Sequence, residues 1–340
     1  MSRSRLATAL DEGLDLPSDG LLVLRPPAAM DLSALPREGV TILHGFRPDR
    51  DAWAGAGYRI AEDVPAAQAA LVCVPRSKAL ARALIAQAAR LAPLVVVDGQ
   101  RTDGVDAVWR EVRTRRDEVQ GLTQGHGRLF WFAGGAGFED WALGAPEKGE
   151  DGLFSQPGVF SADGPDRGSL LLAEALPPKL PARMADFGAG AGVLTLAALS
   201  REGVKSIDLI EAEQLALDCA RLNVNDPRAR FLWEDATKGA RGPYDGIVMN
   251  PPFHTTRQAD PRLGSAFLQA AARALTPQGQ LWVVANRHLP YEAVLAETFR
   301  NVTEIGGTPG FKLLHAAQPL KAKPGGVARA VTRTRRAHSG

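Results

Sequence analysis

The most specific chemistry in this sequence comes from four consecutive residues, Asn250, Pro251, Pro252 and Phe253. Proline has no N–H and a fixed φ, so the Pro251 carbonyl is held outward beside the side-chain carbonyl of Asn250. Two acceptors that converge in this way suit one planar NH₂ group and direct its lone pair at an electrophile. Phe253 offers a π face for a flat ring. The alternative is a plain double-proline turn after a strand.

A second group of residues lies upstream, where Asp186 stands two residues before Gly188. Gly188, Gly190 and Gly192 form the pattern G-x-G-x-G after this acid. Glycines let the backbone come close to a ligand, and the helix that follows offers free N–H groups at its N-terminus. A dinucleotide-binding turn would have G-x-G-x-x-G, and a carboxylate here would repel a pyrophosphate. The acid suits a ligand with a positive amino group, such as S-adenosylmethionine. The alternative is a tight strand-to-helix turn that binds nothing.

Two further acids end the next two strands. Glu211 follows the glycine turn by about 20 residues, a spacing at which a carboxylate can hold the hydroxyls of a ribose. Asp235 could accept a hydrogen bond from an adenine amino group, while the backbone of Ala236 reads a ring nitrogen. Each acid alone is also typical of a solvent-facing strand end. Together with the glycine turn they favour a nucleoside-containing ligand.

The second half of the chain must place these residues, and it alternates strands and helices with clear punctuation. Parallel strands of a doubly wound sheet bring their carboxyl ends to one edge, where such sheets bind ligands. The pattern predicts a strand, the glycine turn and a helix over 183–203, and strands at 206–212, 229–236, 243–253 and 311–317. It also predicts helices at 213–225 and 291–299, and a helix, a Pro-Gln-Gly turn and a strand over 265–286.

The first half is also α/β, but it lacks a glycine-rich turn that opens a helix. Short apolar runs predict buried strands at 21–26, 40–45, 70–75, 93–99 and 127–134. A helix is predicted at 77–93, with Ser77 as its N-cap and Pro93 as its stop. The stretch 132–152 is rich in Gly and polar residues and predicts a linker, with a domain boundary near residue 148.

Composition limits the class of protein. The 340 residues suggest about two domains, and 45% hydrophobic and 23% charged residues are typical of a globular chain. No apolar run is long enough to span a bilayer, and the N-terminus does not resemble a secretory signal. The two cysteines and six histidines show no metal-ligand or disulfide pattern, so we expect no metal, no membrane and a cytoplasmic location.

Charge is unevenly distributed along the chain. Residues 320–340 hold six Lys or Arg and no Asp or Glu, whereas both halves before them are slightly acidic. A basic tail favours a polyanion such as RNA, and the alternative is a solvated terminus without a partner. Elsewhere, Lys312 is a candidate phosphate contact, and His254 could contact RNA or orient its loop.

Together these motifs resemble a class I S-adenosylmethionine-dependent methyltransferase that acts on an exocyclic or amide nitrogen. The flanking segments 158–172, 284–299 and 310–316 narrow the resemblance to the ribosomal RNA small subunit methyltransferase C family and its large-subunit relatives, which make N2-methylguanosine. The resemblance is good over 155–318 and faint over 1–130. It implies two tandem Rossmann-like methyltransferase-fold domains, with a seven-stranded doubly wound sheet in the second.

The resemblance also implies domain roles. Residues 1–148 would be a degenerate copy of the fold without a cofactor site, used for RNA docking or structure; residues 149–319 would bind S-adenosylmethionine and catalyse; residues 320–340 would be a basic, flexible tail. Carried over by motif, the expected donor contacts are Phe160, Ser161, Ser169, Asp186, Gly188, Gly190, Glu211, Asp235, Ala236 and Asn250. The expected contacts of the target base are Asn250, Pro251 and Phe253.

The resemblance therefore implies direct methyl transfer to guanine N2 in 16S ribosomal RNA, and we expect a monomer that binds the RNA or the small subunit. The base would have to leave its stack to reach such a pocket. Other substrates stay open: 23S rRNA guanine, DNA adenine N6 or a protein glutamine, although those last families place mostly Tyr or Trp where Phe253 stands. A non-catalytic ribosome-assembly factor with the same fold is the alternative from another class.

Overall fold

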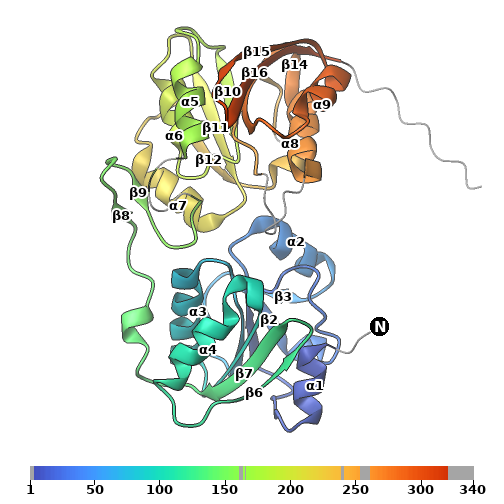
Figure 1. The fold of residues 1–340 in the computed structure, drawn as a ribbon, viewed down its shortest axis with the longest axis vertical. Coiled ribbons are helices and arrows are strands. Elements are labelled where there is room, and N and C mark those ends of the chain that lie inside the picture. The colour runs from blue at the N-terminus through green and yellow to red at the C-terminus, as the bar shows by residue number, and fades with distance from the viewer. Residues whose placement is uncertain (1–3, 161–163, 165, 239–240, 253–260, 321–340) are drawn as a thin grey trace, which may run out of the picture.

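The computed structural model describes residues 4–160, 164, 166–238, 241–252 and 261–320. Within them, two seven-stranded sheets follow one another along the chain, with strand orders β3-β2-β1-β4-β5-β7-β6 and β12-β11-β10-β13-β14-β16-β15. The two orders are the same pattern, so the predicted fold class, two tandem doubly wound α/β units, is confirmed. Figure 1 shows one unit above the other, joined along one side by the segment that carries β8 and β9.

The first sheet is parallel except at one edge. Its central strand β1 pairs with β2 and β4 in parallel, while β7 runs antiparallel to both β5 and β6. Apolar clusters cover both faces of the sheet, as a doubly wound fold requires. The strands are β1 (Leu21–Leu24), β2 (Val40–Leu43), β3 (Arg59–Ile60), β4 (Ala69–Cys73), β5 (Leu94–Gln100), β6 (Gln120–Gln124) and β7 (Gly127–Ala133).

The second sheet repeats this arrangement around β10, which lies between β11 and β13. The parallel strands β10–β14 end at one edge of the sheet, and β16 runs antiparallel between β14 and β15. Apolar clusters again cover both faces. The strands are β10 (Arg183–Phe187), β11 (Ser206–Glu211), β12 (Ala229–Trp233), β13 (Tyr244–Met249), β14 (Leu275–Asn286), β15 (Phe299–Gly307) and β16 (Phe311–Pro319).

Helices connect the strands, and the side chains of Ser4, Ser77 and Asp166 each cap the start of one of them. Ser77 accepts a hydrogen bond from the backbone N–H of Leu80, as its predicted N-cap role requires. Asp166 accepts one from Ser169. The helices are α1 (Arg5–Asp11), α2 (Arg47–Gly55), α3 (Lys78–Leu91), α4 (Val105–Arg113), α5 (Arg167–Ala175), α6 (Val193–Leu199), α7 (Gln214–Asn223), α8 (Pro261–Ala274) and α9 (Tyr291–Thr298). Short 3-10 turns lie at η1 (Arg37–Gly39), η2 (Arg101–Asp103), η3 (Glu139–Trp141) and η4 (Ala236–Lys238).

The stretch 132–152 is more structured than its composition predicts. Phe138 and Trp141 are buried in the core of the first unit, with ring centroids 5.2 Å apart. A two-stranded hairpin of β8 (Glu147–Lys148) and β9 (Phe154–Ser155) follows. The burial of these two rings orders a segment whose Gly and polar content predicts a linker.

The Pro-Gln-Gly turn predicted inside 265–286 lies within the first residues of β14. Tyr244 of β13 pairs with Leu275 and Gly246 with Gln280, so two steps along β13 oppose five along β14, and a Cβ on Gly279 would lie 2.8 Å from that of Leu275. The ladder then shifts register before Gly246 meets Gln280. A β-bulge of this kind absorbs a proline at the start of a strand.

Candidate active site

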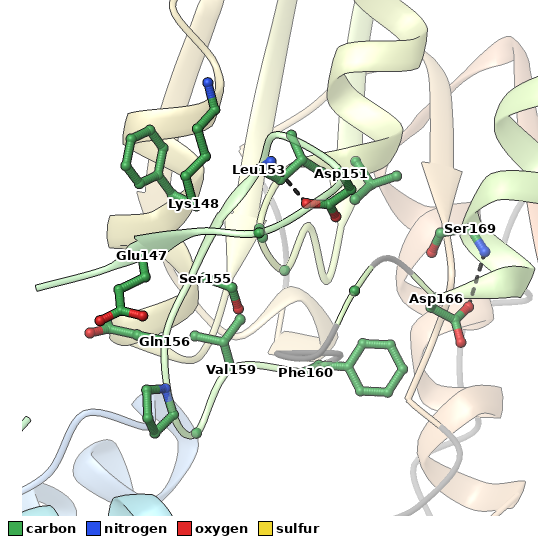
Figure 2. A pocket seen from close by; sticks show the side chains of 18 of the residues that line it. Glu147, Lys148, Asp151, Leu153, Ser155, Gln156, Val159, Phe160, Asp166 and Ser169 are labelled. Atoms are coloured by element: carbon green, nitrogen blue, oxygen red, sulfur yellow. Dashed lines mark hydrogen bonds between the residues drawn. The ribbon is translucent and has the colours of Figure 1, made fainter. Parts of the chain in front are cut away.

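A cavity of about 1580 Å³ opens beside the glycine turn of the second unit. Its walls come from the turn after β10, the residue after β13, the β8–β9 hairpin with the segment that follows it, and the start of α3 in the first unit. Figure 2 shows Phe160, Asp166 and Ser169 along one side of this space and the hairpin residues along the other. Gly188, Gly190, Ser169 and Asn250 line the same cavity, as the sequence predicts.

The glycine turn contributes a close backbone approach rather than free N–H groups. Gly188 and Gly190 have φ of +73° and +55°, a left-handed conformation that favours glycine. A Cβ on Gly190 would meet no atom within 4 Å, so this residue faces open space. The N–H of Gly188 donates to Ile210 and that of Gly190 to Glu211. Strand β11 and its terminal acid thus already use the amides of Gly188 and Gly190.

Asp186 lies directly behind this turn and is fully buried. The Thr195 hydroxyl donates to its Oδ2 at 2.8 Å, and Oδ1 is buried without a hydrogen-bond partner among the described residues. Burial raises the pKa of Asp186 to about 7, because a carboxylate loses hydration there. An orphaned acceptor at this place fits a ligand that brings a cationic donor.

This titration predicts that affinity for a ligand with an ammonium group rises with pH. The ammonium favours the ionised carboxylate, so binding releases a proton below the pKa of about 7. For one such group, affinity should rise about eightfold between pH 6 and 7.5 and then level off. Calorimetry with S-adenosylhomocysteine across this range measures the slope. Asp186→Asn should flatten it, and a slope that survives in this variant would contradict the assignment.

Glu211 ends β11 next to the turn and is held by two backbone amides. Its Oε2 accepts from Gly190 at 2.8 Å, and its Oε1 accepts from Glu213 at 2.8 Å. Burial raises the pKa of Glu211, and the two amides act in the opposite direction. Each carboxylate oxygen keeps a second lone pair, so the group can still accept hydrogen bonds from a diol. Its position is thus fixed by the turn on one side and by the start of α7 on the other.

Asp235 and Ala236 lie after β12, one strand further from the centre of the sheet. Oδ1 of Asp235 accepts from the N–H and the hydroxyl of Thr237, at 2.9 and 2.6 Å. Ala236 is buried under the 3-10 turn that begins there. Among the described residues that line the cavity, neither of these two appears, and neither does Asp186 or Glu211. Asp186 and Glu211 lie directly behind the glycine turn, and Asp235 and Ala236 follow the outer strand β12.

Asn250 is the best-oriented side chain of the site. Its Nδ2 donates to Oδ2 of Asp166 at 2.8 Å and to Oγ of Ser169 at 2.9 Å. A carboxylate can only accept, so the amide must place its nitrogen on that side. Both amide protons are used there, and Oδ1 therefore points away from Asp166 and Ser169. This is the acceptor that the Asn-Pro-Pro motif predicts.

The remaining expected contacts of the donor and of the base, and their neighbours, are placed in part. Pro251 is buried, Pro252 is exposed, and Phe160 is 62% exposed at the cavity with a ring able to stack on a flat ligand. Ser161 and Phe253 lie outside the described residues, as does His254. Their assignments stay predictions.

Sequence reasoning missed Asp166, although it lies three residues before the expected Ser169. The same Oδ2 that binds Asn250 accepts from the Ser169 backbone N–H at 3.0 Å and so caps α5. A Cβ on Gly168 would come within 2.8 Å of this oxygen, so glycine leaves room for the carboxylate. An acid three residues before a serine at a helix start is an N-cap signal, but the contact with Asn250, 84 residues away, has no local signature.

The expectation that Lys312 contacts a phosphate is wrong. It is 3% exposed and pairs with Glu292 at 2.6 Å, so it is a buried structural cation rather than a phosphate contact. Cys73 and Cys219 are both free and buried. Over the described ranges, no cluster of potential metal ligands occurs, and no helix is long and apolar enough to cross a membrane.

Comparisons with known proteins give matches in sequence and in fold. The domain family described as "Methyltransferase small domain" matches residues 151–315. "Ribosomal RNA small subunit methyltransferase C" of Shewanella piezotolerans is 34% identical over 178 residues, 52% of this chain and 52% of that protein. The protein of the same name from Psychromonas ingrahamii is 35% identical over 164 residues, 48% and 47% of the two chains. The chain thus spans about half the length of these relatives.

Two matches extend further. The protein of that name from Shewanella halifaxensis is 30% identical over 258 residues, which cover 72% of this chain and 75% of that one. A solved structure of the T. thermophilus 16S rRNA N2 methyltransferase in complex with AdoMet and guanosine has a TM-score of 0.76. It is 23% identical, covers 93% of this chain and 92% of its own, and shows the shared fold. On the fold and the extended sequence match, this chain belongs to the ribosomal RNA small subunit methyltransferase C family.

Proposed function

We propose that this chain is an S-adenosylmethionine-dependent N-methyltransferase that acts on guanine N2 of 16S ribosomal RNA. The single observation that carries the proposal is Asn250, whose amide is oriented by Asp166 and Ser169 in the cavity that also holds the glycine turn. An oriented carbonyl beside a turn built for close approach fits an amine acceptor and a methyl donor. The relatives named above, one of them solved with AdoMet and guanosine, point to the same pair of ligands.

We assign the donor contacts as the motifs imply. Gly188 and Gly190 would lie against the methionine part, with the orphaned Oδ1 of Asp186 as the anion for its ammonium. Glu211 would hold the ribose, and Asp235 would face the adenine. When bound, the donor supplies an electrophilic methyl group on a sulfonium. The further assigned contacts are Phe160, Ser161, Ser169, Ala236 and Asn250 for the donor, and Pro251 and Phe253 for the base.

The chain's own residues act on the amine. The lone pair of guanine N2 is delocalised into the ring, so this nitrogen is a weak nucleophile until hydrogen bonds reorient it. Oδ1 of Asn250 and the Pro251 carbonyl would accept its two protons, and these bonds strengthen as positive charge develops. The Asp166 carboxylate, 2.8 Å from Nδ2 of Asn250, polarises the amide and makes Oδ1 a better acceptor. Positioning supplies the rest of the rate enhancement.

An in vitro assay with radiolabelled donor tests the substrate. We expect methyl transfer to 16S rRNA or to the small subunit, with N2-methylguanosine in the digested product. In cells that lack the gene, one N2-methylguanosine should disappear from 16S rRNA. Faster transfer to 23S rRNA, DNA or a glutamine peptide than to 16S rRNA would assign the enzyme to that substrate instead. Donor binding that is absent altogether would favour an assembly factor.

We further propose a division of labour along the chain. Residues 149–319 would catalyse, residues 1–148 would dock the RNA, and the basic residues 320–340 would add affinity for a polyanion. In the first unit, β1 is followed by Arg25 and two prolines instead of a glycine turn, which favours a degenerate copy without a donor site. A cytoplasmic monomer is the state in which we expect it to meet its substrate.

Asp166 should be a positioning residue for the rate of transfer. Asparagine caps a helix as well as aspartate, so Asp166→Asn should keep α5 but lose the anion that orients Asn250. We expect kcat to fall about tenfold, as for one lost charge-assisted hydrogen bond, with little change in donor affinity. Ser4→Ala removes the cap of α1 far from the site and is the matched control. An unchanged kcat in Asp166→Asn would remove the role.

A further inference from the structure

The first unit contacts the second through two backbone hydrogen bonds, next to the acid that we assign to the donor's ribose. The N–H of Arg47 donates to the carbonyl of Ala212 at 2.8 Å, and the N–H of Gln214 donates to the carbonyl of Gly45 at 2.9 Å. Phe46 and Glu213 form the antiparallel bridge between these bonds. The turn from β11 into α7 is therefore held by Gly45, Phe46 and Arg47 at the start of α2, which faces the second unit in Figure 1.

An ion pair reinforces this clamp. Arg25, at the end of β1, donates from both terminal nitrogens to the two carboxylate oxygens of Glu213, at 3.2 and 2.5 Å. The two side chains are only 16% and 15% exposed, so the pair is bidentate and largely shielded from solvent. Pairs of this kind hold geometry better than exposed ones do. A Cβ on Gly45 would come within 3.2 Å of Glu213, so glycine leaves room for the pair.

Glu213 is in turn bonded to the acid assigned to the ribose. Its backbone N–H donates to Oε1 of Glu211, whose Oε2 accepts from Gly190. A continuous path of contacts thus runs from Arg25 in the first unit through Glu213 and Glu211 to the glycine turn. The Arg25 guanidinium also offsets the second negative charge beside Glu211, which would otherwise repel it.

We propose that Arg25 is a positioning residue for the donor site: by holding Glu213, it fixes the Glu211 carboxylate for the ribose hydroxyls. The inference rests on the proposed function, because it presumes a ribose at Glu211. It gives the first unit a part in donor binding that is separate from RNA docking. We assign the methionine part to Gly188 and Gly190, so we expect the loss of Arg25 to weaken recognition of the ribose most.

The test compares two ligands, S-adenosylhomocysteine and its 2′-deoxyribose analogue, by calorimetry on the full chain. In the wild type we expect the ribose ligand to bind about tenfold tighter, as for one hydrogen bond to a charged group. In Arg25→Met this preference should shrink to less than about threefold, because affinity falls for the ribose ligand and not for the deoxy analogue. Arg25→Lys, which keeps the charge, should restore part of the preference.

Two further variants separate positioning from general stability. Glu213→Gln keeps the backbone bond to Glu211 but loses the ion pair. It should show the same reduced ribose preference that we expect for Arg25→Met, and it replaces Arg25→Met as the test if that variant does not fold. Arg183→Met breaks an exposed ion pair with Asp245 on the second unit and should leave the preference intact. Equal losses for both ligands in Arg25→Met, or an unchanged preference, would overturn the inference. A wild type that binds neither ligand would overturn the proposed function, and the inference with it.

Discussion

Asn250→Ala should reduce methyl transfer by about 10²-fold or more while donor affinity stays close to normal. The variant removes the carbonyl that accepts from the attacking amine, and loss of one preorganised group of this kind typically costs that much in kcat. It also leaves Asp166 and Ser169 without the amide that joins them. Single-turnover transfer to 16S rRNA and calorimetry with S-adenosylhomocysteine separate the two quantities.

Asn301→Ala is the matched control, because this asparagine lies exposed on the edge strand β15. It should leave both transfer and binding unchanged. If Asn250→Ala turned over at the wild-type rate, Asn250 would have no part in activating the amine. If donor binding fell as steeply as the rate, its role would be to hold the donor.

The parts of the site predictable from the sequence are those whose chemistry is local. The spacing of Asp186, Gly188 and Gly190 specifies a left-handed turn after a strand, and the structure places that turn at the cavity. The Asn-Pro-Pro run predicts a rigid pair of carbonyls at the end of β13, the neighbour of β10 in the sheet. Parallel topology then brings both to one edge of the sheet, because β10 and β13 are neighbours.

What could not be predicted depends on contacts between distant residues. Asp166 reaches Asn250 across 84 positions, and Arg25 reaches Glu213 across 188. Neither contact leaves a periodic or spacing signal. The use of the Gly190 N–H by Glu211 leaves no such signal either, although the sequence analysis singles out both residues as candidate donor contacts.

Three edge strands, β3, β6 and β15, are missing from the sequence analysis, whereas the edge strand β12 is predicted there within 229–236. β15 is exposed along most of its length, and β3 and β6 contain no buried residue. Pattern reasoning finds a strand by an apolar run or by alternation, and an edge strand with polar residues on both faces shows neither. The shared strand order of the two units shows where each belongs.

Asp186→Ala should lower the affinity for S-adenosylhomocysteine by about 10- to 100-fold. A buried anion that binds an ammonium is worth about 1.5–3 kcal/mol, and its loss leaves the Thr195 hydroxyl unpaired as well. The kcat at saturating donor should change far less, because the carboxylate does not touch the accepting base. Calorimetry and rates at saturating donor check the two parts.

Asp186→Asn adds a stability measurement that a simple packing residue would not show. The folded-state pKa of about 7 lies above the unfolded value, so ionisation of Asp186 opposes folding as pH rises from about 4 to 7. Replacing it with a neutral isostere should therefore raise Tm more at pH 8 than at pH 5, while donor affinity falls. Thr195→Val should move the pH midpoint of donor binding upward, since the hydroxyl stabilises the carboxylate. If the Tm difference between Asp186→Asn and the wild type were the same at both pH values, the buried Asp186 carboxylate would not have the raised pKa assigned to it.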